Sequence, residues 1–415
     1  RAFQRGFALG ARLLPWRTPT VLSGAGSLLK LPDVFSREGA SRPLVVASRR
    51  QCADERFLAL RAALEGRGVR PSVFSGVEPD PSVATVEKLA AQYLVLGGGS
   101  PIDAAKVAAA RIVRPDKTVA QLGGLLKVRR PLPLFIAVPT TAGTGSEATI
   151  AAVVTGEEHR KYAVSDLCLI PRYAVLDPTL TLSLPPAVTA QTGMDALTHA
   201  GEAYLSLYYN TRETRALAES AVRDIFRYLP VACRDGQSLT ARERMLRASF
   251  DAGCAFTRAS VGNVHAIAHT LGGLYGIPHG LACAVTLPVV LEDYGAAVHP
   301  HLARLGSLIG LTGTERERAV GFLAAIRALN ASLGIPDRFD GIRGEDLPRM
   351  AAWAAAETNP VYPVPAACLS GCAPEPPHAS HLCRCLTKPP LTFLAKPPFL
   401  CYNDSINFSE MKERP

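Results

Sequence analysis

Long apolar runs are absent from this sequence. The longest, around Leu134–Val138 and Leu281–Leu291, are well short of the roughly 20 residues that a helix needs to cross a bilayer. The chain has 415 residues, of which 48% are hydrophobic and 20% are charged, which is the composition of a globular protein with a sizeable core. We therefore expect a protein of two or three domains that makes no contact with a membrane.

A continuous basic stripe is also missing. The formal net charge is +9, but residues 1–50 alone hold nine Lys and Arg against two acidic residues, and the last fifty residues are nearly balanced. The body of the chain is close to neutral, which argues against a nucleic-acid partner. The first 32 residues lack Asp and Glu, as organelle transit segments do. Because Leu14–Arg17 reads as folded protein, we expect a cytoplasmic location, with an organelle matrix as the alternative.

The ten cysteines do not form the dense framework of a small secreted protein. Five are scattered through apolar contexts and are typical of buried reduced thiols, namely Cys52, Cys168, Cys233, Cys254 and Cys283. The other five lie in the proline-rich residues 366–415, where their spacing with His378 and His381 fits no compact zinc module. The Asn-x-Ser motifs at Asn403 and Asn407 matter only in a secreted protein. We predict that 366–415 is a disordered tail with no role in catalysis.

The rest of the chain divides into two kinds of pattern. Up to about Pro185, short aliphatic segments alternate with helical ones, which predicts a parallel sheet with crossover helices. From Pro186 to about Thr358 the apolar residues follow a helical spacing, as in Glu213–Leu229 and Arg242–Phe256. We predict an α/β domain over 1–185 and a helical domain over 186–365. The predicted strands are Pro43–Ser48, Pro71–Ser75, Tyr93–Leu96, Leu134–Val138 and Tyr173–Leu176.

The first candidate binding loop is LGGGSPIDAAK at 96–106, where a predicted strand ends in three glycines and a helix begins. Glycines allow a tight turn, Ser100 can cap the helix, and a helix N-terminus attracts phosphate. The loop has neither the GxGxxG nor the Walker pattern, which excludes an ordinary Rossmann or P-loop site. A plain structural corner remains the alternative for this loop alone.

The second candidate loop is VPTTAGTGSE at 138–147, another predicted strand followed by small hydroxyl residues. Hydroxyl groups and bare backbone suit an anionic or sugar-bearing ligand, although a solvated loop would have the same composition. Two such loops after parallel strands lie at the same carboxyl edge of the sheet, where ligands bind in open α/β folds.

Histidines and one carboxylate form the strongest pattern. Asp195 and His199 are spaced i, i+4 on one helix face, His265 and His269 repeat that spacing, and His279 follows a Gly-rich turn. A lone histidine on an apolar helix is usually a core or surface residue, but four of the nine histidines in apolar, Gly-rich context would each need a polar partner. A shared cation would satisfy them together. Three imidazoles and one carboxylate suit Fe²⁺ or Zn²⁺ and leave a position for a substrate oxygen.

From about Leu14 to Pro365 the chain resembles the iron-containing, metal-dependent (group III) alcohol dehydrogenases. The resemblance is carried by GGGSPIDAAK, PTTAGTGSE, TGMDALTHA, NVHAIAHTLGG and GIPHG, which occur in the family's order and spacing. It implies an N-terminal α/β dinucleotide-binding domain, an all-α C-terminal domain and a cleft between them that holds the cofactor and the metal. It also implies an NAD(P)-dependent enzyme, expected to be a homodimer, that transfers hydride between the nicotinamide and a small alcohol or aldehyde.

The resemblance also implies site residues, carried over position by position. The metal ligands would be Asp195, His199, His265 and His279, and the metal would act as a Lewis acid on the substrate oxygen. His269 would lie beside the substrate and the nicotinamide as a proton relay. The dinucleotide would be bound by Gly97, Gly98, Gly99, Ser100, Asp103, Thr140, Thr141, Thr144, Ser146 and Lys161.

Departures from the family leave alternatives open. Where NAD-preferring members often carry Asp, this chain has Ser48 followed by Arg49 and Arg50, so we expect appreciable use of NADPH. The helix before Tyr93 is shorter than the family's, and the resemblance stops at Pro365. A dehydroquinate-synthase-like lyase and a catalytically impaired relative are the competing interpretations.

Overall fold

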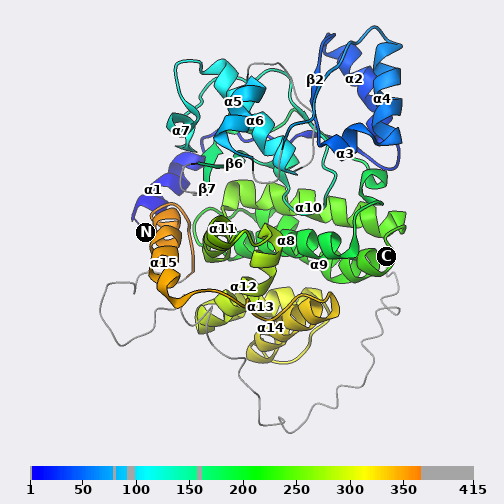
Figure 1. Cartoon of the computed structure of the whole chain (residues 1–415). Helices are drawn as coiled ribbons and strands as arrows, with labels where there is room; N and C mark the ends of the chain where they lie inside the picture. Colours follow the sequence, from blue (N-terminus) through cyan, green and yellow to red (C-terminus); the bar gives the residue numbers. More distant parts are fainter. Residues whose placement is uncertain (1, 78–80, 91–98, 157–160, 366–415) are drawn as a thin grey trace.

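The computed structural model describes residues 2–77, 81–90, 99–156 and 161–365. Three of the predicted features therefore lie outside the described residues: the strand Tyr93–Leu96, the glycines Gly97 and Gly98, and the tail 366–415. The protein has an α/β part and a helical part, which Figure 1 shows one above the other. The predicted fold class is confirmed.

The strands of the α/β part are short and form three small sheets. Their orders are β1-β8-β5, β2-β3 and β4-β7-β6; all pairs are parallel except β6 with β7. Four of the predicted strands are present: β8 has the predicted bounds, and β2, β3 and β5 are shorter than predicted. Strands β1, β4, β6 and β7 were not predicted. The bounds are β1 (Thr20–Ser23), β2 (Leu44–Val46), β3 (Ser72–Phe74), β4 (Gly124–Leu125), β5 (Ile136–Ala137), β6 (Ala151–Thr155), β7 (Lys161–Ser165) and β8 (Tyr173–Leu176).

Helices flank these sheets, and α6 is the one that packs most extensively on a strand. It is rich in alanine and buried along most of its length, so it packs closely on β6. Lys106 in α6 is fully buried, and its Nζ donates to the Thr149 and Ala151 carbonyl oxygens at 2.7 and 3.0 Å. This contact fastens α6 to the start of β6. The helices of this part are α1 (Ala2–Ala11), α2 (Leu31–Arg37), α3 (Arg49–Cys52), α4 (Glu55–Glu65), α5 (Val83–Ala90), α6 (Gly99–Val113) and α7 (Val119–Leu122).

The helical part is built around α8, which contacts α9, α10 and α12. The helices predicted at Glu213–Leu229 and Arg242–Phe256 are α9 and α10, each a few residues longer. The apolar sides of α8 to α15 meet in one extended core. The bounds are α8 (Pro186–Leu205), α9 (Arg212–Arg234), α10 (Leu239–Ala259), α11 (Asn263–Tyr275), α12 (His279–Asp293), α13 (His299–Leu308), α14 (Glu315–Ser332) and α15 (Leu347–Thr358).

None of the helices in the described ranges is by itself long and apolar enough to span a membrane. One pair, α12 with Gly295–Leu308, passes that test by length and composition, but its two halves are bent by 106°.

Candidate active site

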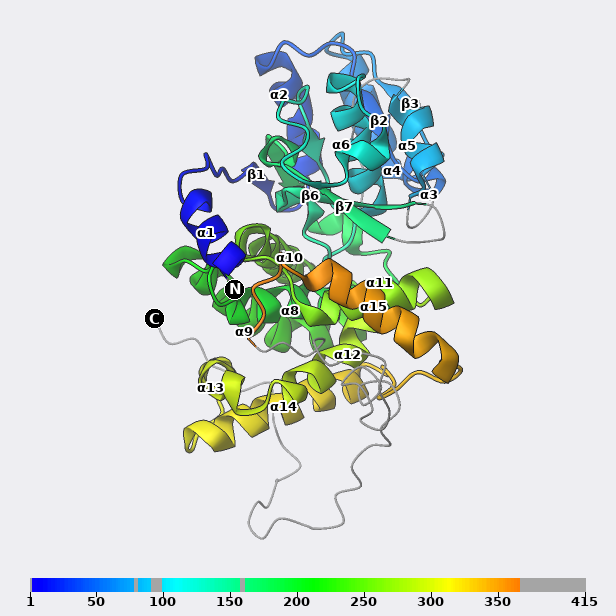
Figure 2. The same cartoon turned by 90° about the vertical axis from the view of Figure 1, so that its left-hand side faces the viewer.

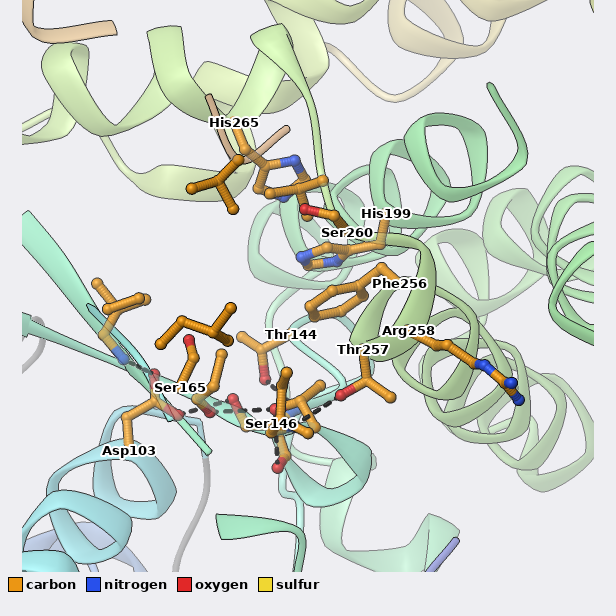
Figure 3. Close-up of a pocket in the computed structure, with 18 of the residues that line it drawn as sticks. Asp103, Thr144, Ser146, Ser165, His199, Phe256, Thr257, Arg258, Ser260 and His265 are labelled. Atoms are coloured by element: carbon orange, nitrogen blue, oxygen red, sulfur yellow. Dashed lines mark hydrogen bonds between the residues drawn. The ribbon is translucent and has the colours of Figure 1, made fainter. Parts of the chain in front are cut away.

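A cavity of about 310 Å³ lies between the α/β part and the helical part. In Figure 3, Asp103 and Ser146 approach it from the α/β side, while His199 and His265 approach it from the helical side. The structure therefore brings residues of both candidate loops and the histidine cluster to one cavity. The predicted site residues that line it are Gly99, Ser100, Asp103, Thr144, Ser146, Lys161, Asp195, His199, His265, His269 and His279.

The second candidate loop reaches this cavity because it packs directly on α10. Gly145 has φ +60°, and a Cβ on it would lie 2.7 Å from the Gly253 Cα in α10. Only glycine allows both that backbone conformation and that approach. The next residue, Ser146, donates from Oγ to the Asp103 Oδ1 at 2.9 Å, and Asp103 Oδ2 accepts from the Val153 N–H at 3.0 Å. Asp103 thus ties α6, the loop and β6 together at the rim of the cavity.

A carboxylate oxygen forms the centre of the histidine cluster. Asp195 Oδ1 lies 3.8 Å from His199 Nδ1, 3.7 Å from His265 Nε2 and 3.5 Å from His279 Nε2. Asp195 and His199 come from one face of α8, His265 from α11 and His279 from the first turn of α12. Helix α12 reaches α8 because Gly280 packs against the Gln191 carbonyl, where any Cβ would overlap.

Three atoms of this cluster lack partners. Asp195 Oδ1, His199 Nδ1 and His265 Nε2 are buried and have no hydrogen-bond partner among the described residues. Buried polar atoms without partners are costly, so such a group at separations of 3.5 to 3.8 Å fits a cation between them. Burial lowers the pKa of His199 to about 3 and that of His279 well below its usual range, so both rings are neutral, the form that binds metal.

Cys283 approaches the same cluster. Ligand atoms of Asp195, His265, His279 and Cys283 all lie within 4.8 Å of one another, and the Cys283 Sγ is 3.7 Å from His279 Nε2. Burial raises the pKa of this thiol well above its usual value, so it is protonated and a weak ligand. Cys283 was predicted only as a buried reduced thiol, although its i+4 spacing from His279 was a signal that it lies near the cluster.

Glu202 holds His265 in place. Its carboxylate accepts from the Gly262 and Val264 N–H groups at 2.8 and 2.7 Å, and its Oε2 lies 2.6 Å from His265 Nδ1. With Nδ1 engaged, His265 Nε2 faces Asp195. Burial by itself would lower the pKa of His265, but Glu202 and Asp195 raise it to about 9. The same negative charge favours a bound cation.

His269 has a different partner. Its Nδ1 lies 2.8 Å from Glu357 Oε1, and that oxygen also accepts from the Tyr362 hydroxyl at 2.8 Å. Burial by itself would raise the pKa of Glu357, but His269 and Tyr362 lower it. The ring stacks on His279 with centroids 5.2 Å apart, so His269 lies beside the cluster. Glu202 was detectable as a carboxylate seven residues after Asp195 on the same helix face, whereas Glu357 is 88 residues from its partner and had no local signal.

Two of the predicted cofactor residues line a second cavity, and one lines neither. Ser48 and Thr140 lie with Arg50 and Gln51 around a cavity of about 170 Å³. Ser48 Oγ accepts from the Gln51 N–H as the N-cap of α3, and Gln51 Nε2 donates to Thr140 Oγ1 at 2.5 Å. Thr141 lines neither of these two cavities.

The fold and the cleft define a class of protein, the metal-dependent nicotinamide oxidoreductases, since hydroxyl- and glycine-rich loops of an α/β part face a cluster of imidazoles around a carboxylate. Two family models identify the member of that class. Residues 18–178 match "Iron-containing alcohol dehydrogenase" and residues 189–367 match "Fe-containing alcohol dehydrogenase family, C-terminal". The chain belongs to the iron-containing alcohol dehydrogenase family.

Individual relatives agree with this assignment. The 1,3-propanediol dehydrogenase of Klebsiella pneumoniae is 40% identical over 314 residues, which are 71% of this chain and 80% of the relative. Alcohol dehydrogenase 4 of Schizosaccharomyces pombe is 35% identical over 82% of this chain and 84% of its own. Among solved structures, a 1,3-propanediol oxidoreductase superposes with a TM-score of 0.81 at 34% identity, covering 86% of this chain and 96% of that one.

These matches confirm the predicted family and enzyme class. The protein is a metal-dependent oxidoreductase that transfers hydride between a nicotinamide dinucleotide and a small alcohol or aldehyde. The family implies a metal, mainly Fe²⁺, and NAD(H). Neither the lyase nor the impaired-relative interpretation gains support from the matches.

Proposed function

We propose that Asp195, His199, His265 and His279 hold the divalent cation of this dehydrogenase. The observation that carries the proposal is the meeting of three imidazole nitrogens around Asp195 Oδ1, with buried ligand atoms that have no other described partner. His199 is preferred to Cys283 as the fourth ligand because its buried Nδ1 would otherwise remain unpaired, while the neutral Cys283 thiol binds metal weakly.

The two candidates for the fourth ligand are separable by metal content. His199→Ala is expected to lose most of its iron on dialysis, and Cys283→Ala is expected to retain it at the wild-type ratio. The opposite result would make Cys283 the fourth ligand in place of His199. Equal retention by both variants would mean that the remaining three residues suffice.

When bound, the cation polarises the oxygen of the alcohol or aldehyde and the dinucleotide carries the hydride. His269 supplies the proton in aldehyde reduction and accepts it in alcohol oxidation. Its Nδ1–H donates to Glu357, which leaves Nε2 as the nitrogen that exchanges a proton in the cavity. Tyr362 donates to the same carboxylate oxygen and so fixes Glu357 as the orienting partner of His269.

For the dinucleotide, we propose a position across both cavities. Gly99, Ser100, Thr144, Ser146 and Lys161 contribute to the main cavity, with Asp103 bracing its rim. Gly97, Gly98, Thr140 and Thr141 complete the set implied by the family motifs. A helix N-terminus with small hydroxyl residues opposite it suits a diphosphate.

Ser48 favours acceptance of NADPH. Its Oγ accepts a backbone hydrogen bond, so its O–H remains as a donor toward a 2′-phosphate, and Arg50 lines the same cavity. Arg50 Nη2 donates to the Ser183 carbonyl at 3.2 Å, which holds the guanidinium at the rim. NADPH is therefore expected to support turnover comparable to that with NADH.

The activity itself is tested with purified, iron-loaded protein and a panel of aldehydes in the presence of NADH or NADPH. Steady consumption of reduced cofactor that requires both iron and aldehyde is the expected result. Product formation without net change in the cofactor would instead support the lyase alternative.

We further propose that residues 1–185 and 186–365 are the cofactor and catalytic domains of a cytoplasmic homodimer without nucleic-acid or membrane partners. The near-neutral charge of the body of the chain argues against a nucleic-acid partner. Light scattering would establish the oligomeric state, and cell fractionation would distinguish the cytoplasm from an organelle matrix.

A further inference from the structure

The first residues of the chain precede the segment that matches the family model, which begins at residue 18, yet they are fixed at the junction of the two parts. Helix α1 lies at that level in both Figure 1 and Figure 2. Gln4 Nε2 donates to the Tyr362 carbonyl at 2.7 Å, and the Phe7 ring packs edge-on against Tyr209 with centroids 5.3 Å apart. The Arg17 guanidinium donates to the Ile170 carbonyl on the α/β side. Residues 2–17 are therefore held by both parts of the protein.

This N-terminal segment reaches the main cavity. Phe7, Leu14 and Trp16 all line it, and so does Phe256. The Phe256 ring stacks on His199 with centroids 4.2 Å apart. Figure 3 shows the two rings facing each other. Phe256, which contacts the histidine cluster, therefore lines the same cavity as the three side chains of the N-terminal segment.

The polar atoms of the aromatic side chains in this region are already paired. Trp16 Nε1 donates to the Ala11 carbonyl at 2.7 Å, and the Tyr209 hydroxyl donates to the Val361 carbonyl at 3.1 Å. The Tyr362 hydroxyl is bound to Glu357. Polar side chains such as Arg258 and Ser260 also line the cavity, but Phe7, Leu14 and Phe256 present only carbon atoms, so a hydroxyl or charged group that packs against these three side chains would lose water without gaining a partner.

We propose that residues 2–17 form a specificity-determining wall of the substrate pocket that selects alcohols and aldehydes with an apolar, uncharged chain. Phe7, Leu14 and Trp16 limit the length of that chain. The inference rests on the proposed function in one respect, which is that the reacting oxygen lies at Asp195 and its imidazoles.

The first test changes one side chain in two directions. Leu14→Ala enlarges the pocket and Leu14→Trp fills it, and Leu13→Ala is the matched control because Leu13 is 86% exposed. The readout is the ratio of kcat/KM for hexanal to that for propanal at saturating cofactor. We expect about a tenfold rise in Leu14→Ala, about a tenfold fall in Leu14→Trp and a change under about twofold in Leu13→Ala. A folding defect would lower both rates without moving the ratio in opposite directions.

A second test uses wild-type protein with aldehydes of similar length. Pentanal is expected to exceed 4-oxobutanoate, which carries a terminal carboxylate, by about 100-fold in kcat/KM. Equal rates, or preference for the carboxylate, would overturn the apolar wall and assign the Arg258 guanidinium, 5.6 Å above the Trp16 ring, as an anion-binding group.

A third test does not depend on turnover. The chain has two tryptophans, so Trp353→Phe leaves Trp16 as the single tryptophan, whose emission can be excited selectively. Hexanol is expected to shift its emission at concentrations where ethanol does not. No shift, or identical chain-length ratios in the Leu13 and Leu14 variants, would refute the wall. Failure of propanal turnover in iron-loaded wild type would instead refute the proposed reaction site.

Discussion

Glu202 offers the sharpest test of the proposed metal centre, because it contacts a ligand and does not itself lie at the cation. In Glu202→Gln the charge opposite His265 Nδ1 is removed while the side chain keeps its shape. Loss of such an orienting partner typically weakens metal binding by about 10- to 100-fold, or about 1.4 to 2.7 kcal/mol. We expect iron affinity to fall by that amount.

Glu202→Ala should also lower the stability of the metal-free protein, in addition to its affinity for iron. The Gly262 and Val264 N–H groups would lose their acceptor in a buried position. At about 1 to 3 kcal/mol for each unpaired group, the free energy of unfolding of the metal-free protein should fall by about 2 to 6 kcal/mol. Glu202→Gln keeps one carbonyl oxygen as acceptor and should lose less.

The assay is iron retention against graded chelator, together with urea unfolding of the metal-free proteins. Glu357→Gln is the matched control, because its carboxylate pairs with His269 and Tyr362. It should lower turnover and leave iron affinity unchanged. The reasoning is refuted if Glu202→Gln binds iron as tightly as wild type, or if Glu357→Gln loses iron equally.

Three further predictions follow from other contacts. Asp195→Ala and His279→Ala should abolish activity and lower iron content, as should chelation of the wild type, with Fe²⁺ restoring only the wild type; full turnover with bound iron in His279→Ala would contradict the ligand set. Ser48→Asp should lower kcat/KM for NADPH about tenfold relative to NADH, because a carboxylate repels the 2′-phosphate, and an unchanged ratio would remove Ser48 from cofactor selection. Burial raises the pKa of Glu147 to about 7 from an ordinary 4.5, so the folded state binds this proton more tightly; that stabilisation is complete below about pH 4.5 and is lost as pH rises through 7. In urea unfolding, the free energy of unfolding of the wild type should fall between pH 5 and 8, and in Glu147→Gln this fall should be smaller by about 3 kcal/mol. If the free energies of the two proteins run parallel against pH, Glu147 is not the source of the fall.

The division into an α/β part and a helical part was readable from the sequence because it depends on local periodicity. Helices α9 and α10 have apolar residues at helical spacing and polar caps, and both were predicted within a few residues of their bounds. Strands β6 and β7 were missed, although the burial of β6 alternates as a half-buried strand should. Alanine and lysine have low β-propensity, so these five-residue segments give little strand signal, and only the pairing of β6 with β7 decided the structure.

The spacing of Asp195 with His199, and of His265 with His269, was fixed by the sequence as well, because a helix places residues i and i+4 on one face whatever surrounds it. Which of these side chains meet was decided only by tertiary packing. Gly280 lets α12 close on α8 and carries His279 to Asp195, while α15 carries Glu357 to His269 and so gives that ring a partner outside the cluster.

The same limit applies to the cofactor residues and to the N-terminal segment. Motif matching placed Ser48, Thr140 and Thr141 with the other loop residues, but the first two line a separate cavity and Thr141 lines neither. Phe7, Leu14 and Trp16 are unremarkable in sequence, and only the docking of α1 brings them to the pocket. A motif in the sequence specifies which chemical groups a segment can offer. Contacts between residues that are hundreds of positions apart depend on how the helices and loops pack, and that packing determines which groups share one cavity.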